Sequence, residues 1–336
     1  MNVKRKLLIS AIKALHLLGL DKLYIQNGAV ILMYHSISDG TDISYIDPSN
    51  DMNKSIFEFQ MKYLKRYCNV ISLTELNNLM TKGKEIPCRT VAITFDDGYK
   101  NNFTNAVPIL NKYDLPATIF LATKYIDQEI PQWIDELYNI YKYRTKHLFM
   151  HPNGNEASIT ITNNNQHQVY RQLTASFLTT SFEQRMDWIE QLRKQLLPNV
   201  TMPILTMSWD DVRCIRDNYQ NISIGSHTDD HVDISKLNAN EINKQVSLSV
   251  NRIEKQTGLK PKLFTYPYGR SSKRAVKEVA SLGLEFALVT EPLKLTTHNS
   301  NKLEITRVES PESKILFKHY VSGSYPALAQ KLFSRY

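Results

Sequence analysis

Short apolar runs alternate with helix-like segments along most of this chain, and this alternation restricts the fold more than any other feature. The runs fall at residues 30–35, 91–95, 117–121, 222–225, 263–266 and 286–289. Each run has the length of one buried strand, and several intervening segments carry apolar residues at helical spacing. Strands that alternate with helices pair in parallel. The sequence therefore predicts an α/β fold with a parallel sheet, either closed into a barrel or open as a doubly wound layer.

One stretch, residues 128–207, breaks the alternation. It holds a polar, Asn-rich middle between amphipathic stretches, and residues 158–162 alternate in a way that is typical of a surface hairpin. We interpret it as a mixed α/β insertion into one domain that spans residues 29–336. Its tryptophans, Trp133 and Trp188, either stack on a sugar ring or form the insertion's own small core.

The N-terminal residues 1–28 are interpreted as an amphipathic helix. A basic run at 4–6 precedes apolar residues at helical spacing. Lys13 and His16 interrupt the apolar stretch, and no cleavage site of the secretory type follows. The helix either packs on the domain or lies on an anionic membrane surface through residues 1–20.

Cysteine content and charge narrow the location and the partners. The 3 cysteines are irregularly spaced, which argues against a disulfide framework and favours a reducing compartment. We therefore expect a cytoplasmic protein, either free or peripheral at the inner face of the membrane. The formal net charge of +8 favours acidic partners, but no Lys/Arg block of the nucleic-acid type is present. Nucleic acid is not an expected partner.

Two adjacent carboxylates follow the run at 91–95. Asp96 and Asp97 come directly after it, and Gly98 completes an Asp-Asp-Gly sequence. The dipeptide Asp-Gly alone is typical of a turn. Two acids at the rim of a buried strand are costly unless they have a partner, however, and this favours a chemical role.

Two histidines, His227 and His231, follow the run at 222–225. Taken alone, their spacing is also that of solvated loop histidines. In a parallel α/β fold the carboxyl ends of the strands face one side, so the histidines and the two carboxylates converge. Two imidazoles and one carboxylate suit Zn²⁺, Co²⁺, Mn²⁺ or Fe²⁺ and leave positions open for water and substrate. The other carboxylate is then free to act as a base.

Three stretches resemble motifs of the NodB-homology polysaccharide deacetylases and occur in the same order. They are Thr94–Gly98, Ser226–His231 and Phe264–Gly269. The resemblance covers residues 30–127 and 208–310. It implies a distorted, incomplete (β/α) barrel with fewer strands than a full eight. It also implies metal-dependent removal of acyl groups, usually acetyl, from sugars.

The resemblance assigns roles by position. It implies that Asp96 is the general base. It implies that Asp97, His227 and His231 bind the metal. The backbone N–H of Tyr268 is implied to contribute to the oxyanion site. The implied cofactor is one divalent ion, with zinc in first place and cobalt, manganese, nickel or iron as alternatives.

Two positions depart from the family pattern. Thr265 stands where many members carry an arginine that orients the base. The leucine-x-histidine that supplies the general acid in many members is also missing. The nearest candidate, Leu295–His298, has a different spacing. His298 is therefore either the acid or a residue of a surface loop.

His35 and Arg307 are candidates for the missing roles. The pair Tyr34-His35 resembles the Tyr-His at the first strand of biofilm-polysaccharide deacetylases. We hypothesise that His35 hydrogen-bonds Asp96 or acts at the leaving amine, and the alternative is a core histidine. Arg307, at the end of the last predicted strand, either serves the site by orienting an acid or binding substrate, or forms a structural ion pair.

The sequence thus predicts a metal-dependent hydrolase that removes N-acetyl groups from an amino sugar of a polysaccharide or glycan precursor. One alternative is a deformylase or deacylase of a lipid-linked or nucleotide-linked amino sugar. Another, from a different class, is a catalytically silent carbohydrate-binding relative.

Overall fold

The computed structural model describes residues 10, 14, 27–40, 45–154, 157–178, 180–290 and 295–324. The helix predicted over residues 1–28 falls almost entirely outside them, and so does the membrane contact predicted for residues 1–20. In the described part of the chain, no helix combines the length and apolar character needed to cross a membrane.

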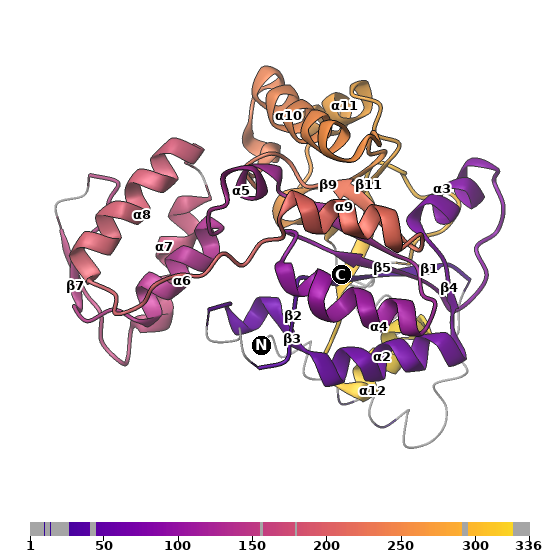
Figure 1. Cartoon of the computed structure of the whole chain (residues 1–336), viewed down its shortest axis with the longest axis horizontal. Helices are drawn as coiled ribbons and strands as arrows, with labels where there is room; N and C mark the ends of the chain where they lie inside the picture. Colours follow the sequence, from indigo (N-terminus) through magenta and orange to yellow (C-terminus); the bar gives the residue numbers. More distant parts are fainter. Residues whose placement is uncertain are drawn as a thin grey trace.

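Seven parallel strands of the described chain form a closed barrel, which occupies the centre of Figure 1. They are β1 (Ala29–Tyr34), β5 (Thr90–Phe95), β6 (Ala117–Leu121), β9 (Ile222–Ser226), β10 (Leu263–Thr265), β11 (Phe286–Thr290) and β12 (Ile305–Glu309). The ring closes because β1 pairs in parallel with both β5 and β12. The short strand β4 (Asn69–Val70) pairs with the start of β5. The barrel with fewer than eight strands is therefore confirmed, and the open doubly wound layer is excluded.

The alternation of side chains along each strand decides what reaches the barrel interior. Ala92 of β5 and Ile305 of β12 belong to one interior apolar cluster, with residues of β1, β10 and β11. Thr94 and Arg307 lie two residues further along these strands and therefore share the interior side. Asp96 continues the same alternation just beyond β5. Polar groups thus follow the apolar layer at the carboxyl end of the barrel.

Helices cover the outside of the barrel. They are α2 (Lys54–Tyr67), α3 (Leu73–Thr81), α4 (Val107–Lys112), α9 (Trp209–Asn218), α10 (Ala239–Thr257), α11 (Lys273–Ser281) and α12 (Lys314–Val321). Two of them begin with reciprocal capping boxes, Ser208 with Asp211 in α9 and Asn238 with Glu241 in α10. A two-stranded parallel sheet of β2 (Ser36–Ser38) and β3 (Asp51–Asn53) follows β1.

The segment between β6 and α9 stands to one side of the barrel, at the left of Figure 1. It contains α5 (Thr123–Gln128), α6 (Trp133–Lys142), β7 (Leu148–Met150), β8 (Ser158–Thr160), α7 (Gln166–Phe177) and α8 (Phe182–Leu196). Strands β7 and β8 pair antiparallel, so the predicted hairpin residues form one strand of this ribbon. Trp133 and Trp188 are both buried in the segment's own apolar cluster. Of the two alternatives for these tryptophans, the structure therefore favours the core.

Candidate active site

The site begins where β5 ends. Asp96 and Asp97 are 2% and 3% exposed, so both carboxylates are removed from bulk water. Asp97 has a backbone φ of 72°, in the left-handed region that non-glycine residues rarely adopt. Gly98 repeats this φ, and a Cβ there would come within 2.9 Å of the Leu121 side chain. The glycine is thus required by a tight turn, and the turn sends two neighbouring carboxylates in different directions.

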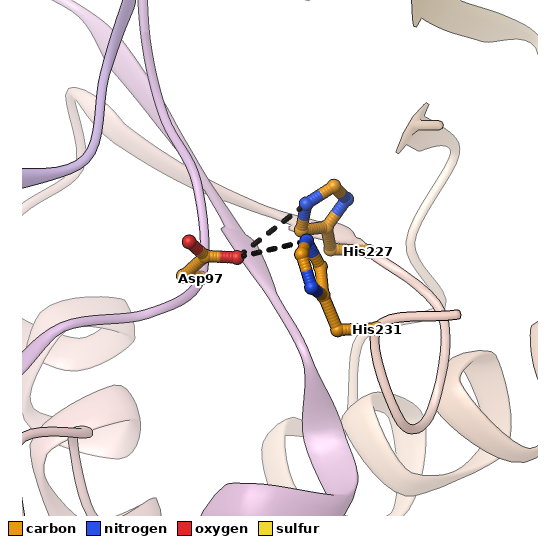
Figure 2. Close-up of side chains that lie close together, drawn as sticks. All are labelled: Asp97, His227 and His231. Carbon is orange, nitrogen blue, oxygen red and sulfur yellow. Dashed lines mark ion pairs between the residues drawn. The ribbon is translucent and has the colours of Figure 1, made fainter. Parts of the chain in front are cut away.

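Asp97, His227 and His231 converge on one point, as Figure 2 shows. The Asp97 Oδ1 atom lies 3.5 Å from His227 Nε2 and 3.4 Å from His231 Nε2. One candidate ligand atom from each residue lies within 4.8 Å of the others. The predicted convergence of the β5 and β9 ends is therefore present, and among the described residues this is the only such cluster of His, Cys, Asp or Glu.

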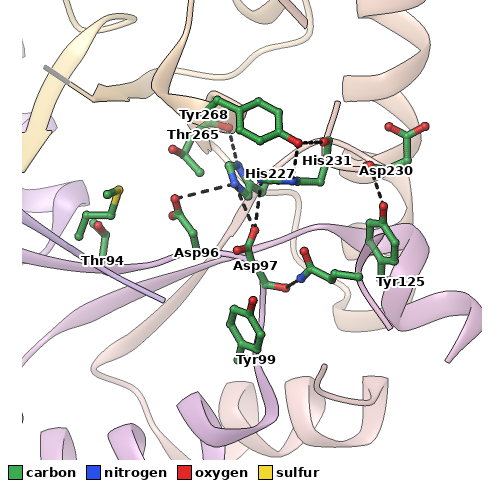
Figure 3. Close-up of polar contacts among 12 residues, drawn as sticks. Thr94, Asp96, Asp97, Tyr99, Tyr125, His227, Asp230, His231, Thr265 and Tyr268 are labelled. Carbon is green, nitrogen blue, oxygen red and sulfur yellow. Dashed lines mark hydrogen bonds and ion pairs between the residues drawn. The ribbon is translucent and has the colours of Figure 1, made fainter. Parts of the chain in front are cut away.

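Hydrogen bonds fix the orientation of both imidazole rings (Figure 3). The Nδ1 atom of His227 lies 2.9 Å from the Thr265 carbonyl oxygen, which can only accept, so Nδ1 carries the proton. The Tyr268 hydroxyl donates to the His231 carbonyl at 3.1 Å and lies 3.2 Å from His231 Nδ1. In both rings the Nε2 lone pair is then free to face Asp97. This is the arrangement that metal-ligating histidines use.

The electrostatics of the three residues also fit a divalent cation. Asp97 Oδ1 is buried and has no hydrogen-bond partner in the part of the chain that the structure describes, although a buried carboxylate oxygen normally has one. Burial first, and then the charge of Asp96, raises the pKa of Asp97 well above its usual range. Burial lowers the pKa of His227 to about 4 and that of His231 well below its ordinary value, which keeps both rings neutral. Two neutral imidazoles beside a carboxylate oxygen that lacks a hydrogen-bond partner form a donor set that suits zinc and similar ions.

Asp96 has a different partner, Arg307 of β12. The guanidinium Nη1 donates to Asp96 Oδ1 at 2.7 Å, and Nη2 donates to Oδ2. Nη1 also donates to the Thr94 hydroxyl at 3.3 Å. Burial by itself would raise the pKa of Asp96, but the Arg307 guanidinium, with a smaller contribution from His227, holds it well below the usual range. Asp96 is therefore ionised and fixed in orientation by Arg307.

Thr265 contributes to the site through its backbone. Its carbonyl accepts from His227, and its side-chain hydroxyl donates to the Leu288 carbonyl at 3.4 Å. The position at which the resemblance would place an arginine is thus used here, through its backbone, to orient a candidate metal ligand.

His35 lies just past the end of β1, on the same rim. No hydrogen bond joins its side chain to Asp96 in the described part of the chain, where Arg307 engages both Asp96 oxygens. Burial lowers the pKa of His35, while the nearby Asp96 charge acts in the opposite direction. The imidazole is therefore neutral at neutral pH. It can accept a proton in that state, but it is not a resting proton donor.

His298 lies at the other end of the barrel. Thr296, two residues earlier, bridges to Ala29, the first residue of β1. The site lies beyond the last residues of the strands, so the length of β1 separates it from this turn. His298 is therefore a residue of a surface turn and not a candidate acid.

Several contacts in the site are not indicated by the sequence. Gln132, at the start of α6, donates from Nε2 to the Asp97 carbonyl at 2.9 Å. Tyr99 donates to the buried carboxylate of Asp135 at 3.1 Å. The Tyr268 side chain, for which only the backbone had been assigned a role, touches His231. The segment that interrupts the strand–helix alternation thus reaches the metal-ligand candidates directly.

These observations define a (β/α)-barrel protein with a candidate metal centre and an arginine-bound aspartate at the carboxyl end of its strands. A family model described as polysaccharide deacetylase matches residues 83–287, which is more than half of the chain. The chain belongs to the polysaccharide deacetylase family.

Particular relatives match over shorter stretches. The protein YxkH of Bacillus subtilis (strain 168) is 39% identical over 97 residues, which cover 29% of this chain and 32% of that protein. A poly-beta-1,6-N-acetyl-D-glucosamine N-deacetylase of Staphylococcus aureus (strain MSSA476) is 34% identical over 116 residues, 32% of this chain and 40% of that protein. The aligned stretches thus span well under half of these curated relatives.

Solved structures agree with the fold over most of the chain. IcaB from Ammonifex degensii has a TM-score of 0.58 at 14% identity, with 89% of this chain and 98% of that chain covered. The Streptococcus pyogenes deacetylase PplD has a TM-score of 0.54 at 17% identity, with 88% and 99% covered. At these identities the likeness establishes the barrel architecture alone.

Proposed function

We propose that this protein is a metal-dependent hydrolase that removes N-acetyl groups from an amino sugar of a polysaccharide or glycan precursor. The observation that carries the proposal is the pairing of two differently held carboxylates at one barrel rim. Asp97 Oδ1 faces two neutral imidazoles and has no hydrogen-bond partner among the described residues, whereas Asp96 is clamped by Arg307. One carboxylate is thus equipped to hold a cation and the other to handle a proton. The similarity to a Staphylococcus aureus N-deacetylase supports the choice of substrate class.

Asp97, His227 and His231 would hold the ion. When bound, a divalent ion there supplies Lewis-acid polarisation of the amide carbonyl and acidifies water. The Thr265 carbonyl and the Tyr268 hydroxyl would hold the two rings so that each Nε2 atom faces the ion. Zinc stands first for such a donor set, with cobalt, manganese, nickel or iron as alternatives.

Asp96 would take a proton from the attacking water. Its Oδ2 atom lies 3.8 Å from His227 Nε2, so the carboxylate borders the candidate metal position. The guanidinium of Arg307 makes Asp96 a weak base, and the water must therefore be acidified for the transfer to occur. The same low pKa makes protonated Asp96 a strong donor. It would pass the proton to the amide nitrogen as the carbon–nitrogen bond breaks, so that acetate and a free amine leave.

Two further residues complete the proposed reaction. The backbone N–H of Tyr268 would stabilise the oxyanion that forms when water adds to the carbonyl. Tyr268 has a backbone φ of 58°, an uncommon conformation of the kind that aims functional groups. His35, neutral at the same rim, would accept a hydrogen bond from the substrate N–H near the leaving amine.

Acetate release from a substrate panel tests the proposal. The panel contains N-acetylated glycans, nucleotide sugars and lipid-linked amino sugars, with formate and longer acids measured in parallel. We expect acetate from a glycan with the zinc- or cobalt-loaded protein, and loss of turnover in Asp96→Asn with metal retained. Release of formate or another acid from a linked sugar would instead select the deacylase alternative. A protein that binds no divalent metal and releases no acid from any donor would contradict both enzymatic functions.

A further inference from the structure

The loop that carries the two candidate histidine ligands is held in an uncommon backbone conformation. Thr228 has a φ of 65° and His231 a φ of 55°, although neither is a glycine. Such conformations cost about 1–3 kcal/mol each and persist only where surrounding contacts impose them. The position of His231 therefore depends on what holds residues 227–231 from outside.

Several neighbouring elements hold this loop. From α5, Tyr125 donates its hydroxyl proton to the Asp230 carbonyl at 3.2 Å, as Figure 3 shows. From α10, Gln245 donates to Asp230 Oδ2 at 2.9 Å and accepts from the Asp230 N–H at 3.2 Å. Arg252 of α10 pairs with Asp229. These contacts come from elements beside the barrel.

Arg185, in the segment between β6 and α9, also holds the loop 227–231. It lies in the first turns of α8 and is 2% exposed, which is unusual for an arginine. Its Nη1 donates to the Asp230 carbonyl at 3.2 Å and to the His231 carbonyl at 3.5 Å. Its Nη2 donates to Asp230 Oδ1 at 3.3 Å. One planar guanidinium thus contacts the backbone carbonyls of two consecutive residues, Asp230 and His231, and also the Asp230 side chain.

The rest of the Arg185 environment locks the guanidinium in place. The group lies 5.8 Å from the centre of the Trp133 ring, within range for a cation–π contact. Its Nε donates to the Ser181 carbonyl at 3.4 Å. Trp133 in turn stacks on Phe177, with ring centres 5.6 Å apart, in the core of the same segment. Arg185 is therefore anchored in the apolar cluster of its own segment and donates hydrogen bonds to the loop 227–231, which follows β9.

We propose that Arg185 is a positioning residue for the metal centre, through which the segment between β6 and α9 sets the geometry of His231. This inference rests on the proposed function, because it presumes that Asp97, His227 and His231 bind a divalent ion. Arg185 is buried, and its contacts with the loop go to the carbonyls of Asp230 and His231 and to the Asp230 carboxylate. Mutation of a residue that holds a metal ligand in place typically changes the affinity of the protein for the metal about 10–100-fold.

Binding of Co²⁺ to the metal-free full chain tests the inference. The variants are Arg185→Met, which keeps much of the volume, and Arg185→Lys, which keeps the charge but lacks the planar fork. The control is Arg193→Met, because Arg193 lies on the same helix but pairs with Glu136 inside its own segment. Affinity is measured by competition with a chromophoric chelator. Visible absorption of the cobalt-loaded protein reports coordination geometry, and near-ultraviolet circular dichroism reports folding.

We expect the dissociation constant for Co²⁺ to rise about 10–100-fold in Arg185→Met, with altered cobalt bands and a retained fold. Arg185→Lys should recover part of the affinity, and Arg193→Met should equal the wild type. Wild-type affinity and bands in Arg185→Met would overturn the inference while leaving the proposed function intact. If that variant does not fold, Arg185→Lys decides in its place, since wild-type affinity and bands there exclude a role for the fork. Failure of the unaltered protein to bind cobalt or zinc would instead overturn the proposed function.

Discussion

Among the described residues, Arg307 is the only charged side chain paired with Asp96, and replacing it with methionine would remove this partner. The two side chains are 1% and 3% exposed, so water does not substitute for the lost guanidinium. Both Asp96 oxygens lose a charge-assisted hydrogen bond, and Thr94 loses a third contact to the same group. The variant therefore leaves a buried carboxylate uncompensated.

The expected loss of stability follows from that burial. Breaking a buried ion pair by removing one partner costs about 3–5 kcal/mol. In the unaltered protein the pKa of Asp96 lies below its unfolded value, so the pair stabilises the fold above about pH 4 and is lost as the pH falls through the folded pKa. In the variant, burial raises the pKa instead, and stability is lost as the pH rises. The difference between the two proteins should therefore be largest at neutral pH and should narrow as the pH falls.

Activity should change in a matching way. An Asp96 that has lost its orienting fork should lower kcat/KM about 10²–10³-fold, equivalent to about 3–4 kcal/mol of transition-state stabilisation. The acidic limb of the pH–rate profile should also move to higher pH, because a carboxylate without its guanidinium holds a proton more tightly. A purely structural ion pair would lower stability without moving this limb.

Urea unfolding of metal-free protein at several pH values, together with pH–rate profiles, measures both effects. Arg213→Met is a suitable control, because Arg213 makes a comparable but more exposed pair with Asp210 on α9. Arg307→Lys should retain part of the stability and less of the rate, since one ammonium cannot donate to both oxygens in a fixed plane. An unfolding free energy within about 0.5 kcal/mol of the wild type at neutral pH, with an unmoved acidic limb, would refute the reasoning.

Three further perturbations have equally definite outcomes. Asp97→Asn should abolish tight binding of zinc in a calorimetric titration. It should also stabilise the metal-free protein at neutral pH, because it removes a buried carboxylate whose pKa is raised. Unchanged zinc affinity would contradict the ligand assignment. Burial raises the pKa of Asp135 to about 8, so its neutral form stabilises the fold below about pH 4, and that contribution is lost as the pH rises toward 8. Asp135→Asn should therefore stabilise the protein increasingly between these values, with a ceiling of about 6 kcal/mol, and a pH-independent difference in thermal unfolding would exclude this account. His298→Ala should leave turnover within about twofold of the wild type, since the residue lies at the far end of the barrel, and a large loss would show that the turn reaches the site.

The parallel sheet and the meeting of the two carboxylates with the two histidines were accessible from the sequence because both follow from local patterns. The strands have short apolar runs, and parallel pairing brings their carboxyl ends to one side. The closed barrel, and the choice of Asp97 over Asp96 as the candidate ligand, came from the family resemblance. Arg307 was recognised as a candidate, but its partner was not. The alternation that places it inside the barrel is readable in Ile305 and Arg307. Its level relative to Asp96 depends instead on the register of strands far apart in sequence, since the two residues are separated by 211 positions.

The remaining contacts depend on packing that no motif records. Gln132 and Arg185 come from a segment with its own apolar cluster, and nothing in their local sequence indicates which surface of the barrel that cluster meets. The role of the Tyr268 hydroxyl depends on a backbone φ of 58°, which tyrosine does not signal. The tertiary arrangement of one segment on another thus supplied what periodicity and motifs could not.

Closure of the sheet into a ring has a consequence for how such enzymes diverge. Around a closed barrel every strand ends at the same rim, so a side chain on β12 reaches the carboxylate that a residue on β10, two strands away, serves in many relatives. The arginine that contacts the aspartate can therefore stand on different strands while the spatial arrangement of the two side chains stays the same. A search that demands an arginine at position 265 would discard this chain as inactive. Arg307 lies beyond the matched residues 83–287, where such a search does not look.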